Sequence, residues 1–410
     1  MAESCDKAFG RYLRTLRERR RLTLDDVNSL SHTFPDRISK GYLSRCENGH
    51  QKPAFSKVIA LSRIYEVPAD VLVERMELDL ELDRVGGPDT EGLAFSDLTL
   101  AGRDAIQRGY RWAAYGYLRD ATRRADVDPV RESFADQKEQ LACAFMSCGS
   151  AARALGRHRF ALHEFHNLET SIVEGSTIYP LVMERLATCY LALRDSKRAS
   201  EYADLAVVAA TESNDQSFLG YALYGQARVA LQQRDYDTAI DLFQKAYGAH
   251  KSANHPTDCV LTLNSLSQTY FEMKRYGASR RSVEAALGIA EDTGQRRAQA
   301  LSLIMLGELD EVGNRIERAI VAWKKAAAIG KALDDRELQF KSEFLLFRRA
   351  KRDNNAAVAR AIRRRLLKLA PWIPPETEEL SAFKDLLEPE LAGIPEIVSS
   401  SQQAHPRRDN

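Results

Sequence analysis

The stretches TAIDLFQKA (residues 238–246) and RAIVAWKKA (residues 318–326) are copies of one pattern, in which alanines flank a bulky aromatic residue. Both stretches belong to ladders of residues that recur every 40 positions along the chain. The four ladders are Ala187, Ala227, Ser267 and Gly307; Ala199, Ala239, Ser279 and Ala319; Ala203, Phe243, Val283 and Trp323; and Ala206, Ala246, Ala286 and Ala326. Because small residues at these offsets let antiparallel helices pack closely, the ladders predict an array of helical hairpins.

Weaker copies of the pattern extend the array in both directions. RWAAYGYLRDA (111–121) and ALHEF (161–165) precede the strong copies, and AAVARAIRRRLLKLA (356–370) follows them as a candidate C-terminal cap. We therefore expect about seven units over residues 98–370. The pattern resembles the tetratricopeptide repeat, lengthened from the usual size of about 34 residues. That resemblance implies an α-solenoid.

A second motif, ISKGYLSRCENG (residues 38–49), lies in a basic head, because residues 1–63 hold 13 Lys or Arg against 7 Asp or Glu. Ser39 can cap a helix at its N-terminus, and Asn48-Gly49 can end it. Four more short helices fit residues 7–74. The inner face of the motif helix carries Tyr42, Leu43 and Cys46, and the opposite face carries Lys40, Gly41, Ser44, Arg45 and Asn48. An outer face of polar and small residues suits hydrogen bonds to base edges and phosphates.

These residues resemble the helix-turn-helix domain of the phage Cro and CI repressors, also called the xenobiotic response element type. The resemblance rests on IS (38–39), YLSRCENG (42–49), KP (52–53) and the apolar spacing of residues 58–72. The chain departs from the family in two places, since the turn HTFPDR (32–37) is longer by about five residues and Leu24 replaces a frequent Gln. The resemblance implies a five-helix domain that binds double-stranded DNA.

The expected DNA contacts run through Ser39, Lys40, Gly41, Tyr42, Ser44, Arg45 and Asn48. Phosphate contacts would come from the Arg-rich first helix or from the 32–37 turn. Glu47 is expected to act inside the domain, because the corresponding acidic residue of the family pairs or caps there.

The acidic segment after the head marks the expected domain boundary. Residues 64–97 hold 2 Arg against 10 Asp or Glu, and Gly86-Gly87-Pro88 interrupts the segment. The expected order is a helix-turn-helix domain at 1–75, an acidic linker at 76–97, the repeat array at 98–370, and a C-terminal helix with a disordered tail at 371–410.

Composition excludes several classes of protein. The sequence has no phosphate loop, GxSxG or HExxH motif, so we expect no enzyme and no catalytic residue. His163 and His166 share a helical face without a clear third ligand, and the six cysteines form no CxxC pair, so neither a metal nor a cofactor is expected. No apolar run reaches the about 18 residues of a membrane helix, and the first twenty residues hold six Lys or Arg. We expect a soluble cytoplasmic protein.

The two motifs together resemble the peptide-responsive regulators of bacterial quorum sensing. We expect a DNA-binding transcriptional regulator that dimerises on an inverted repeat, with a peptide or protein ligand in the repeat groove. The expected ligand positions flank the first ladder: Glu184, Thr188, Tyr224, Arg228, Asn264, Gln268, Ile304 and Glu308. Asn264 resembles the Asn that such regulators use for the peptide backbone.

Two alternatives stay open at this level. The groove could be a solvated polar surface, or it could be filled by the chain's own tail from Pro371 onward. The protein itself could be an interaction scaffold or a component of an immunity module, with DNA binding secondary or autoregulatory.

Overall fold

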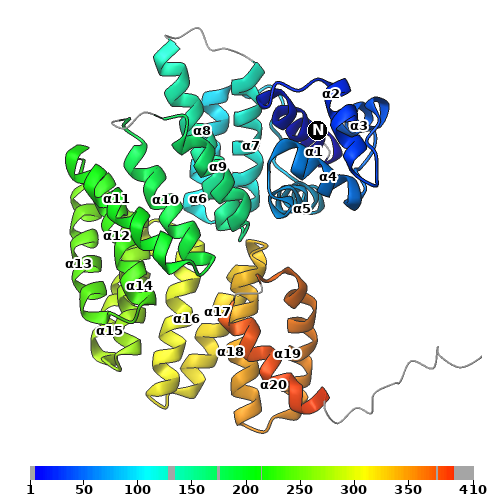
Figure 1. The fold of residues 1–410 in the computed structure, drawn as a ribbon. Coiled ribbons are helices and arrows are strands. Elements are labelled where there is room, and N and C mark those ends of the chain that lie inside the picture. Colours follow the sequence, from blue (N-terminus) through cyan, green and yellow to red (C-terminus); the bar gives the residue numbers. More distant parts are fainter. Residues whose placement is uncertain (1–4, 128–133, 173–175, 214, 375–376, 392–410) are drawn as a thin grey trace, which may run out of the picture.

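The structure, a computed structural model, describes residues 5–127, 134–172, 176–213, 215–374 and 377–391. Within these ranges the regular structure is helical throughout, which confirms the all-α prediction. Two parts follow one another along the chain (Figure 1). A head of short helices precedes an array of longer paired helices, whose expected tail after residue 391 lies outside the described residues.

The head has the five predicted helices and one additional turn of 3-10 helix. They are α1 (Cys5–Arg19), α2 (Leu24–Leu30), η1 (Ser31–Thr33), α3 (Lys40–Glu47), α4 (Phe55–Tyr65) and α5 (Ala69–Val85). The Thr23 hydroxyl accepts from the Asp26 amide while the Asp26 carboxylate accepts from the Thr23 amide, so the predicted capping box starts α2. Ser39 accepts from the Tyr42 amide and starts α3, and Gly49 follows this helix with φ of +72°. These local signals fix the helix boundaries in the head.

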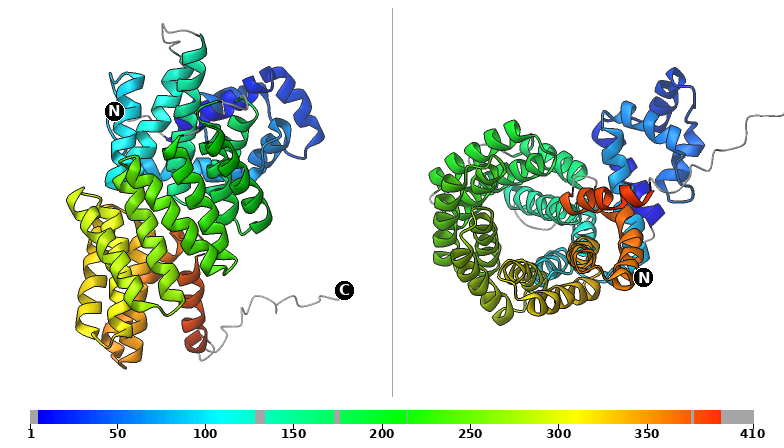
Figure 2. Two further views of the ribbon diagram at one scale, coloured as in Figure 1. Left: turned by 90° about the vertical axis from the view of Figure 1, so that its left-hand side faces the viewer. Right: turned by 90° about the horizontal axis from the view of Figure 1, so that it is seen from below.

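In the described residues the array forms seven helical hairpins, α6/α7 to α18/α19, followed by η2 and α20. The helices are α6 (Phe95–Arg108), α7 (Arg111–Val127), α8 (Phe134–Ala154), α9 (His158–Glu169), α10 (Tyr179–Ala192), α11 (Ser196–Ser213), α12 (Gln216–Gln232), α13 (Tyr236–Ser252), α14 (Pro256–Glu272), α15 (Tyr276–Asp292), α16 (Arg296–Val312), α17 (Ile316–Ala332), α18 (Arg336–Arg352), α19 (Ala356–Leu369), η2 (Ala370–Trp372) and α20 (Glu378–Leu391). Successive hairpins stack side by side and wind into a ring when seen along the superhelix axis (Figure 2). Neighbouring even-numbered helices contact one another more closely than odd-numbered ones do, so the even-numbered helices form the inner face.

The 40-residue ladders are the packing contacts between the two helices of each hairpin. All of their members from Ala187 to Ala326 are buried. The indole of Trp323 occupies the space where a Cβ at Gly307 would lie, and its Nε1 donates to the Ile304 carbonyl at 3.2 Å. Where serines replace alanines, the Ser279 hydroxyl donates to the Ser267 carbonyl at 2.8 Å, so the buried polar group is satisfied. The repeat prediction is confirmed residue by residue.

Helix α5 joins the head to the array without an extended linker. The expected linker began at residue 76, but α5 continues to Val85 and only residues 86–94 separate it from α6. Leu78 and Leu82 of α5 are buried in one core with Tyr115 of α7 and Phe160 of α9. The reason is the apolar spacing of four residues, which gives this acidic stretch a face that packs on the first hairpins.

A network of buried ion pairs lies within this core. We call the contact of α5 with α7 and α9, including these ion pairs, the joint. The Asp79 carboxylate accepts from Arg75 Nε at 2.9 Å and from Arg119 Nη1 at 3.1 Å. The Arg75 guanidinium lies 5.0 Å from the ring centroid of Tyr12 and 5.6 Å from that of Phe160. The acidic residue that was expected in a solvated linker is therefore an internal counter-charge.

One turn of the superhelix brings its first hairpin onto the sixth and seventh. Arg84 at the end of α5 donates to Asp334 at 2.9 Å, and Arg111 at the start of α7 lies 3.2 Å from Glu337. Asp335 accepts from Arg297 Nε at 2.8 Å and lies 3.5 Å from Arg111. We call this contact, which closes the array into a ring, the seam.

The C-terminal segment continues the packing of the inner helices. Leu380, Phe383 and Leu387 of α20 are buried in the same core as Phe340 and Phe347 of α18. The helix predicted at 380–387 is thus present as α20, which packs beside α18. Among the described residues, no helix has the length and hydropathy required to span a membrane.

Candidate nucleic-acid interface and inner face of the array

Helix α3 is held against the head by its apolar side and presents its polar side to solvent. Leu43 and Cys46 are buried, whereas Lys40, Gly41 and Arg45 are exposed. Tyr42 is half-buried, and its hydroxyl accepts from the Ala54 amide at 2.9 Å, which fixes the segment between α3 and α4. The predicted division of this helix into an inner and an outer face is confirmed.

Glu47 anchors the end of α3 to α1. Its side chain is 2% exposed and accepts from Arg17 Nε at 2.7 Å and from Arg17 Nη2 at 2.9 Å. Arg14 donates to Asn48 Oδ1 at 2.8 Å, and the amide of Asn48 donates to the Ser44 carbonyl at the same distance. The internal role predicted for Glu47 is confirmed, and Asn48 is tied to the protein on both sides of its amide.

The other predicted DNA-contacting side chains make weaker contacts at the surface. Lys40 pairs with Asp25 at 2.7 Å, and both side chains are more than half exposed. Arg45 Nε donates to Gln51 Oε1 at 3.2 Å. Because exposed pairs of this kind contribute only about 0–1 kcal/mol, Lys40 and Arg45 can exchange them for a contact with DNA.

The arginines of α1, expected as one source of phosphate contacts, are engaged within the chain. Arg14 and Arg17 hold Glu47, and Arg20 pairs with Glu66. The Arg19 guanidinium lies 5.4 Å from the ring centroid of Phe145 on α8.

The long turn before α3, residues 32–37, is held by helix α4. Lys57 of α4 donates to Asp36 at 2.7 Å and also to the Arg37 carbonyl, while the Arg37 side chain is exposed. The 32–37 turn is therefore the better-placed of the two expected sources of phosphate contacts.

The inner face of the array contains some of the predicted ligand positions and excludes others. Glu184, Thr188 and Ile304 are at most 3% exposed, because the close approach of successive inner helices covers them. Tyr224, Arg228, Asn264 and Glu308 are partly exposed, and Gln268 is exposed. The expectation that Glu184, Thr188 and Ile304 are exposed is wrong.

The polar side chains at the predicted ligand positions differ in how many of their hydrogen-bonding groups already have a partner within the chain. The Tyr224 hydroxyl lies 3.1 Å from Ser265 Oγ, and Gln268 donates to Glu272 at 3.2 Å. Asn264 Oδ1 accepts from Ser302 at 2.9 Å, but its buried Nδ2 has no hydrogen-bond partner. Burial raises the pKa of Glu308, which faces Lys341 and Arg348. The amide of Asn264 is thus left with a donor that a ligand backbone can satisfy.

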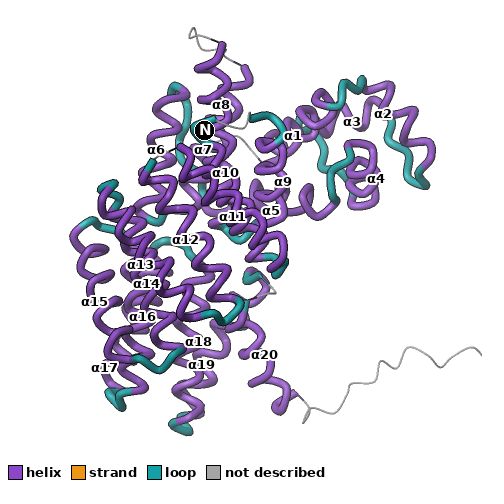
Figure 3. The backbone as a smooth tube through the Cα atoms, turned by 60° about the vertical axis from the view of Figure 1, so that its left-hand side comes forward, coloured by secondary structure: helices purple, strands orange, loops and turns teal. Residues whose placement is uncertain are grey.

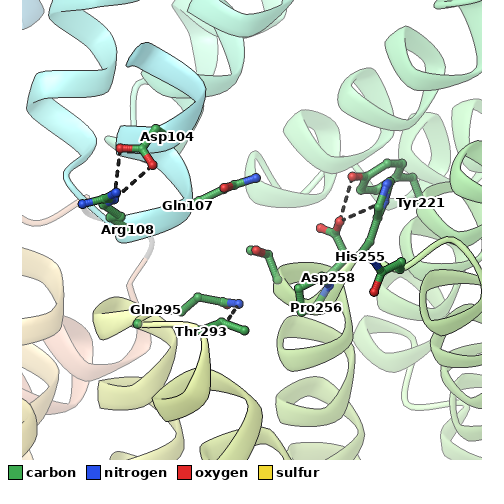
Figure 4. A pocket seen from close by; sticks show the side chains of 12 residues that line it. Asp104, Gln107, Arg108, Tyr221, His255, Pro256, Asp258, Thr293 and Gln295 are labelled. Atoms are coloured by element: carbon green, nitrogen blue, oxygen red, sulfur yellow. Dashed lines mark hydrogen bonds and ion pairs between the residues drawn. The ribbon is translucent and has the colours of Figure 1, made fainter. Parts of the chain in front are cut away.

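A cavity of about 490 Å³ lies where the end of α6 faces the turns before α14 and α16 (Figure 4). Its lining is mostly polar and comprises Asp104, Gln107, Arg108, Tyr221, Asn254, His255, Pro256, Thr257, Asp258, Thr293, Gly294 and Gln295. Figure 4 shows Gln107 reaching from α6 toward the opposite wall, where the Tyr221 hydroxyl donates to Asp258 at 2.7 Å. The sequence did not point to this cavity, because its walls come from four segments that only the superhelical turn brings together.

His250, His255 and Asp258 could hold a metal ion at the edge of this cavity. One nitrogen or oxygen atom of each lies within 4.8 Å of the others. The histidine pair noted in the sequence, His163 and His166, is a different one, and here His166 contacts Glu169 at 2.8 Å and Tyr190 at 2.7 Å. This group could have been found from the sequence, because its three residues lie close together in the chain around the turn between α13 and α14.

Comparison with known proteins identifies the head. Residues 8–76 match the family model described as a helix-turn-helix domain. No curated protein sequence matches the chain.

Several solved structures align with most of the chain at low identity. PlcR of Bacillus thuringiensis in complex with the peptide PapR7 and DNA is 12% identical, over 72% of this chain and 99% of that chain, with a TM-score of 0.43. NprR in complex with its cognate peptide NprX is 15% identical, over 82% and 97%, with a TM-score of 0.49. A Rap protein complexed with competence and sporulation factor is 13% identical, over 89% and 98%, with a TM-score of 0.49.

Proposed function

We propose that this chain is a sequence-specific DNA-binding transcriptional regulator whose helical array binds a peptide or protein ligand. The observation that carries the proposal is α3, which follows the turn of a matched helix-turn-helix domain and presents Lys40, Gly41 and Arg45 to solvent. A helix with this face fits the major groove, where Arg and Lys donate to guanine and Ser and Asn pair with other bases. A helix-turn-helix domain joined to helical repeats is the architecture of a binding protein and not of an enzyme.

The proposed DNA-contacting residues fall into two groups, according to whether their side chains are already engaged within the head. Ser39, Lys40, Gly41, Ser44 and Arg45 form the reading face, with Arg45 the strongest candidate for a bidentate contact to guanine. Tyr42 and Asn48 act mainly by fixing the helix, because the Tyr42 hydroxyl accepts from Ala54 and Asn48 contacts Arg14 and Ser44. A regulator of this kind acts on DNA in the cytoplasm.

The inner face of the array is the proposed ligand site. Tyr224, Arg228, Asn264 and Gln268 lie on successive inner helices and are at least partly accessible. The two amide side chains of α14, Asn264 and Gln268, can satisfy the backbone of an extended peptide, and the open donor of Asn264 supports this role. A signalling peptide, as in quorum sensing, is the ligand class that we propose.

We further propose that the protein acts as a homodimer on an inverted repeat. A single helix-turn-helix head buries little DNA surface, and two heads on half-sites one helical turn apart supply the remaining affinity. The array is the proposed dimer surface, and its last hairpin is the accessible end, because the joint and the seam cover the first hairpin while Val358 and Leu367 of α19 are exposed.

Selection from a random DNA pool tests the proposal without knowledge of the operator. The purified full-length chain should enrich an inverted repeat, and fluorescence anisotropy should then give its affinity. Lys40→Ala with Arg45→Ala should weaken binding by about 10- to 100-fold, since a bidentate base contact contributes about 1–3 kcal/mol. Lys324→Ala with Lys325→Ala on α17 is the charge-matched control, because both lysines are exposed far along the array.

Two results would contradict the proposal. If no sequence is enriched, the interaction scaffold becomes the better description of the chain. If sequences are enriched but the double variant binds them like the parent, DNA contacts another surface.

A further inference from the structure

Three side chains around the turn between α13 and α14 place metal-binding atoms close together. His250 lies in the last turn of α13, His255 precedes α14 as its N-cap, and Asp258 lies in the first turn of α14. One nitrogen or oxygen atom of each lies within 4.8 Å of the others, and His255 Nδ1 is 3.6 Å from Asp258 Oδ2. Side-chain rotations can bring these three atoms onto one ion, which would bind them at about 2.0–2.2 Å.

Both imidazoles have a buried nitrogen without a partner. His250 is 1% exposed, and neither its Nδ1 nor that of His255 has a hydrogen-bond partner in the described part of the chain. A neutral imidazole has one nitrogen that donates and one that accepts, and buried groups of this kind are normally satisfied. A metal ion binds the accepting nitrogen of an imidazole directly, so it supplies a partner to such a ring.

The carboxylate of Asp258 is oriented by the neighbouring hairpin. The Tyr221 hydroxyl of α12 donates to Asp258 Oδ2 at 2.7 Å, which leaves the second oxygen of the carboxylate for an ion (Figure 4). The Tyr221 ring also contacts His250, with 5.1 Å between the ring centroids. The cation beside Tyr221, Arg185, pairs with Glu184, so its charge is compensated without Asp258. Carboxylates that bind metal ions are commonly held by such a hydrogen bond.

The other repeat units show that packing alone does not require these side chains. One and two repeats of 40 residues away, the equivalents of Tyr221, His250 and Asp258 are small or apolar. They are Leu181, Leu261 and Leu301 for Tyr221; Ala210, Ala290 and Gly330 for His250; and Phe218, Ala298 and Leu338 for Asp258. Polar atoms therefore replace apolar ones at three positions of a single junction between hairpins.

The fourth hairpin, α12/α13, makes room for His250 by omitting a side chain opposite it. A Cβ at Gly220 would lie 2.6 Å from His250 Nδ1, so a larger residue at 220 would collide with the ring. In the fifth hairpin, α14/α15, the volumes are reversed, since Val260 stands at the position of Gly220 and packs in one cluster with Ala290. The buried imidazole is thus accommodated specifically in the fourth hairpin.

The donor set identifies the class of ion. Two imidazoles and one carboxylate are a common ligand set of Zn²⁺ sites that keep a fourth position open, whereas Mg²⁺ and Ca²⁺ prefer oxygen ligands alone. The side chains of His255 and Asp258 are 36% and 20% exposed and line the cavity of about 490 Å³. An ion can therefore reach the site through the cavity, and its open position faces that cavity.

We propose that His250, His255 and Asp258 bind a Zn²⁺ ion at the wall of the cavity, with a fourth position that a water molecule or a ligand occupies. The ion would connect α13 to α14 and, through Tyr221, to α12, so it would fix the stacking of the fourth and fifth hairpins. The opposite wall is the end of α6 in the first hairpin, so a ligand on the ion would lie between the first hairpin and the middle of the array. This site depends on neither DNA binding nor peptide binding.

The measurement uses Zn²⁺ itself as the probe and the full-length chain as the protein. After treatment with EDTA and its removal, the chain competes with a chromogenic chelator for Zn²⁺, which gives the number of bound ions and their dissociation constants. Other histidines and cysteines of the chain can also bind Zn²⁺, so the site is assigned from the difference between the parent and its variants.

Two variants remove one ligand each. His250→Ala with Gly220→Val reproduces the Ala290–Val260 pair of the fifth hairpin, so the fold is retained. Asp258→Asn keeps an acceptor for the Tyr221 hydroxyl but loses the charge. Each variant should bind one ion fewer than the parent or bind it at least about 100-fold more weakly, because the loss of an outer hydrogen-bond partner alone costs about 10- to 100-fold.

The controls remove the same chemical groups elsewhere. Asp241→Asn, in the exposed pair with Lys245 on α13, and His50→Ala, exposed in the head, should bind Zn²⁺ like the parent. The site is overturned if the parent binds no Zn²⁺, or if either site variant keeps the parent's number of ions and affinity.

Substitution by Co²⁺ tests the class of ion, because its visible absorption is much stronger in four-coordinate than in six-coordinate sites. The parent should show the strong absorption of four-coordinate Co²⁺, and Asp258→Asn should lose it. Millimolar Mg²⁺ or Ca²⁺ should not displace the ion. Weak six-coordinate absorption, or displacement by Mg²⁺ or Ca²⁺, overturns the assignment to Zn²⁺.

Hydrogen exchange tests the proposed link between the two hairpins. Zn²⁺ should slow exchange at residues 216–225 and 249–260 in the parent and should leave it unchanged in His250→Ala with Gly220→Val. Equal protection in both proteins, or none in the parent, overturns the link.

Discussion

The joint and the seam both involve helix α5, but their charged side chains differ in how far water reaches them. At the joint, Asp79 is 0% exposed and sits between two buried arginines within an apolar core. At the edge of the seam, Arg84 and Asp334 are 44% and 45% exposed, while Asp335 behind them is buried between Arg111 and Arg297. Burial strengthens the electrostatic coupling in the joint, and water weakens it at the edge of the seam. The same residue types thus make one contact that fixes the head and another that can open.

This difference locates where the molecule can move. The head, α7, α8 and α9 share one core and should move together as a body (Figure 3). The seam joins that body to the sixth and seventh hairpins mainly through ion pairs. A ligand on the inner face would therefore change the position of the head by opening or closing the seam.

The largest expected effect is at the joint. Asp79→Ala leaves Arg75 and Arg119 buried without their shared carboxylate, which should cost about 3–5 kcal/mol of unfolding free energy. Urea denaturation measures this change, with Asp241→Ala in the exposed pair with Lys245 as control. A cost of less than 1 kcal/mol, like that expected of the control, would mean that the joint is no firmer than a surface contact.

The second effect separates the seam from the joint. Asp335→Asn keeps the helix cap, in which Asp335 accepts from the Leu338 amide at 3.0 Å, but removes the charge that faces Arg111 and Arg297. We expect a loss of about 1.5–3 kcal/mol, confined to the seam. Hydrogen exchange should accelerate at residues 109–111 and 333–338 and stay unchanged in α5 and α9. Faster exchange throughout the head would show that the two contacts are not independent.

The third effect concerns the pH dependence of the joint. Burial raises the pKa of Glu74 on α5 to about 7, although its Oε2 accepts from the Phe160 amide at 2.8 Å and Arg157 and Arg159 lie nearby. Because folding favours the protonated form, this stabilisation is complete below about pH 4 and is lost as the pH rises through about 7. Glu74→Gln stays neutral and keeps an acceptor for the amide.

The variant should therefore match the parent near pH 5 and exceed its stability at pH 8 by about 1–2 kcal/mol. Melting curves between pH 5 and pH 8 measure the difference. A constant offset between the two proteins across this range would assign the effect to packing and not to titration.

The smallest effect is expected from the exposed part of the seam. Arg84→Ala removes the pair with Asp334, which should contribute at most about 1 kcal/mol and should weaken with salt. Small-angle scattering of the parent at low and high ionic strength should show a more open array at high salt, and the variant should already be open at low salt. If the variant is as closed as the parent at both ionic strengths, the Arg84–Asp334 pair does not help to close the array, and the ion pairs of Asp335 do so.

The sequence predicted the parts of this fold that depend on local patterns. The 40-residue ladders identified the hairpins, and Thr23, Ser39 and Gly49 marked the helix boundaries in the head. Each of these signals acts over at most a few helical turns or between neighbouring units. The outer face of α3 followed from the same helical period, which also separated Leu43 from Arg45.

The remaining features depend on contacts between distant parts of the chain. A count of charges could not distinguish Asp79, which is buried, from Glu77 and Asp83, which are exposed. Glu184 was expected in the groove, but the pitch of the superhelix buries it beside Arg185. The cavity near Asp258 forms only when the array winds into a ring, and repeat spacing does not specify that curvature.

The seam also sets an order of events while the chain is being made. Arg84 and Asp334 are 250 residues apart, so at about 5–20 residues per second the ribosome needs about 10–50 s to supply the second after the first. The head and the helices of the joint have been synthesised before this interval ends, and loop-closure entropy makes the seam a late contact. Every newly made chain therefore passes through a period in which its head is assembled while its array is still open.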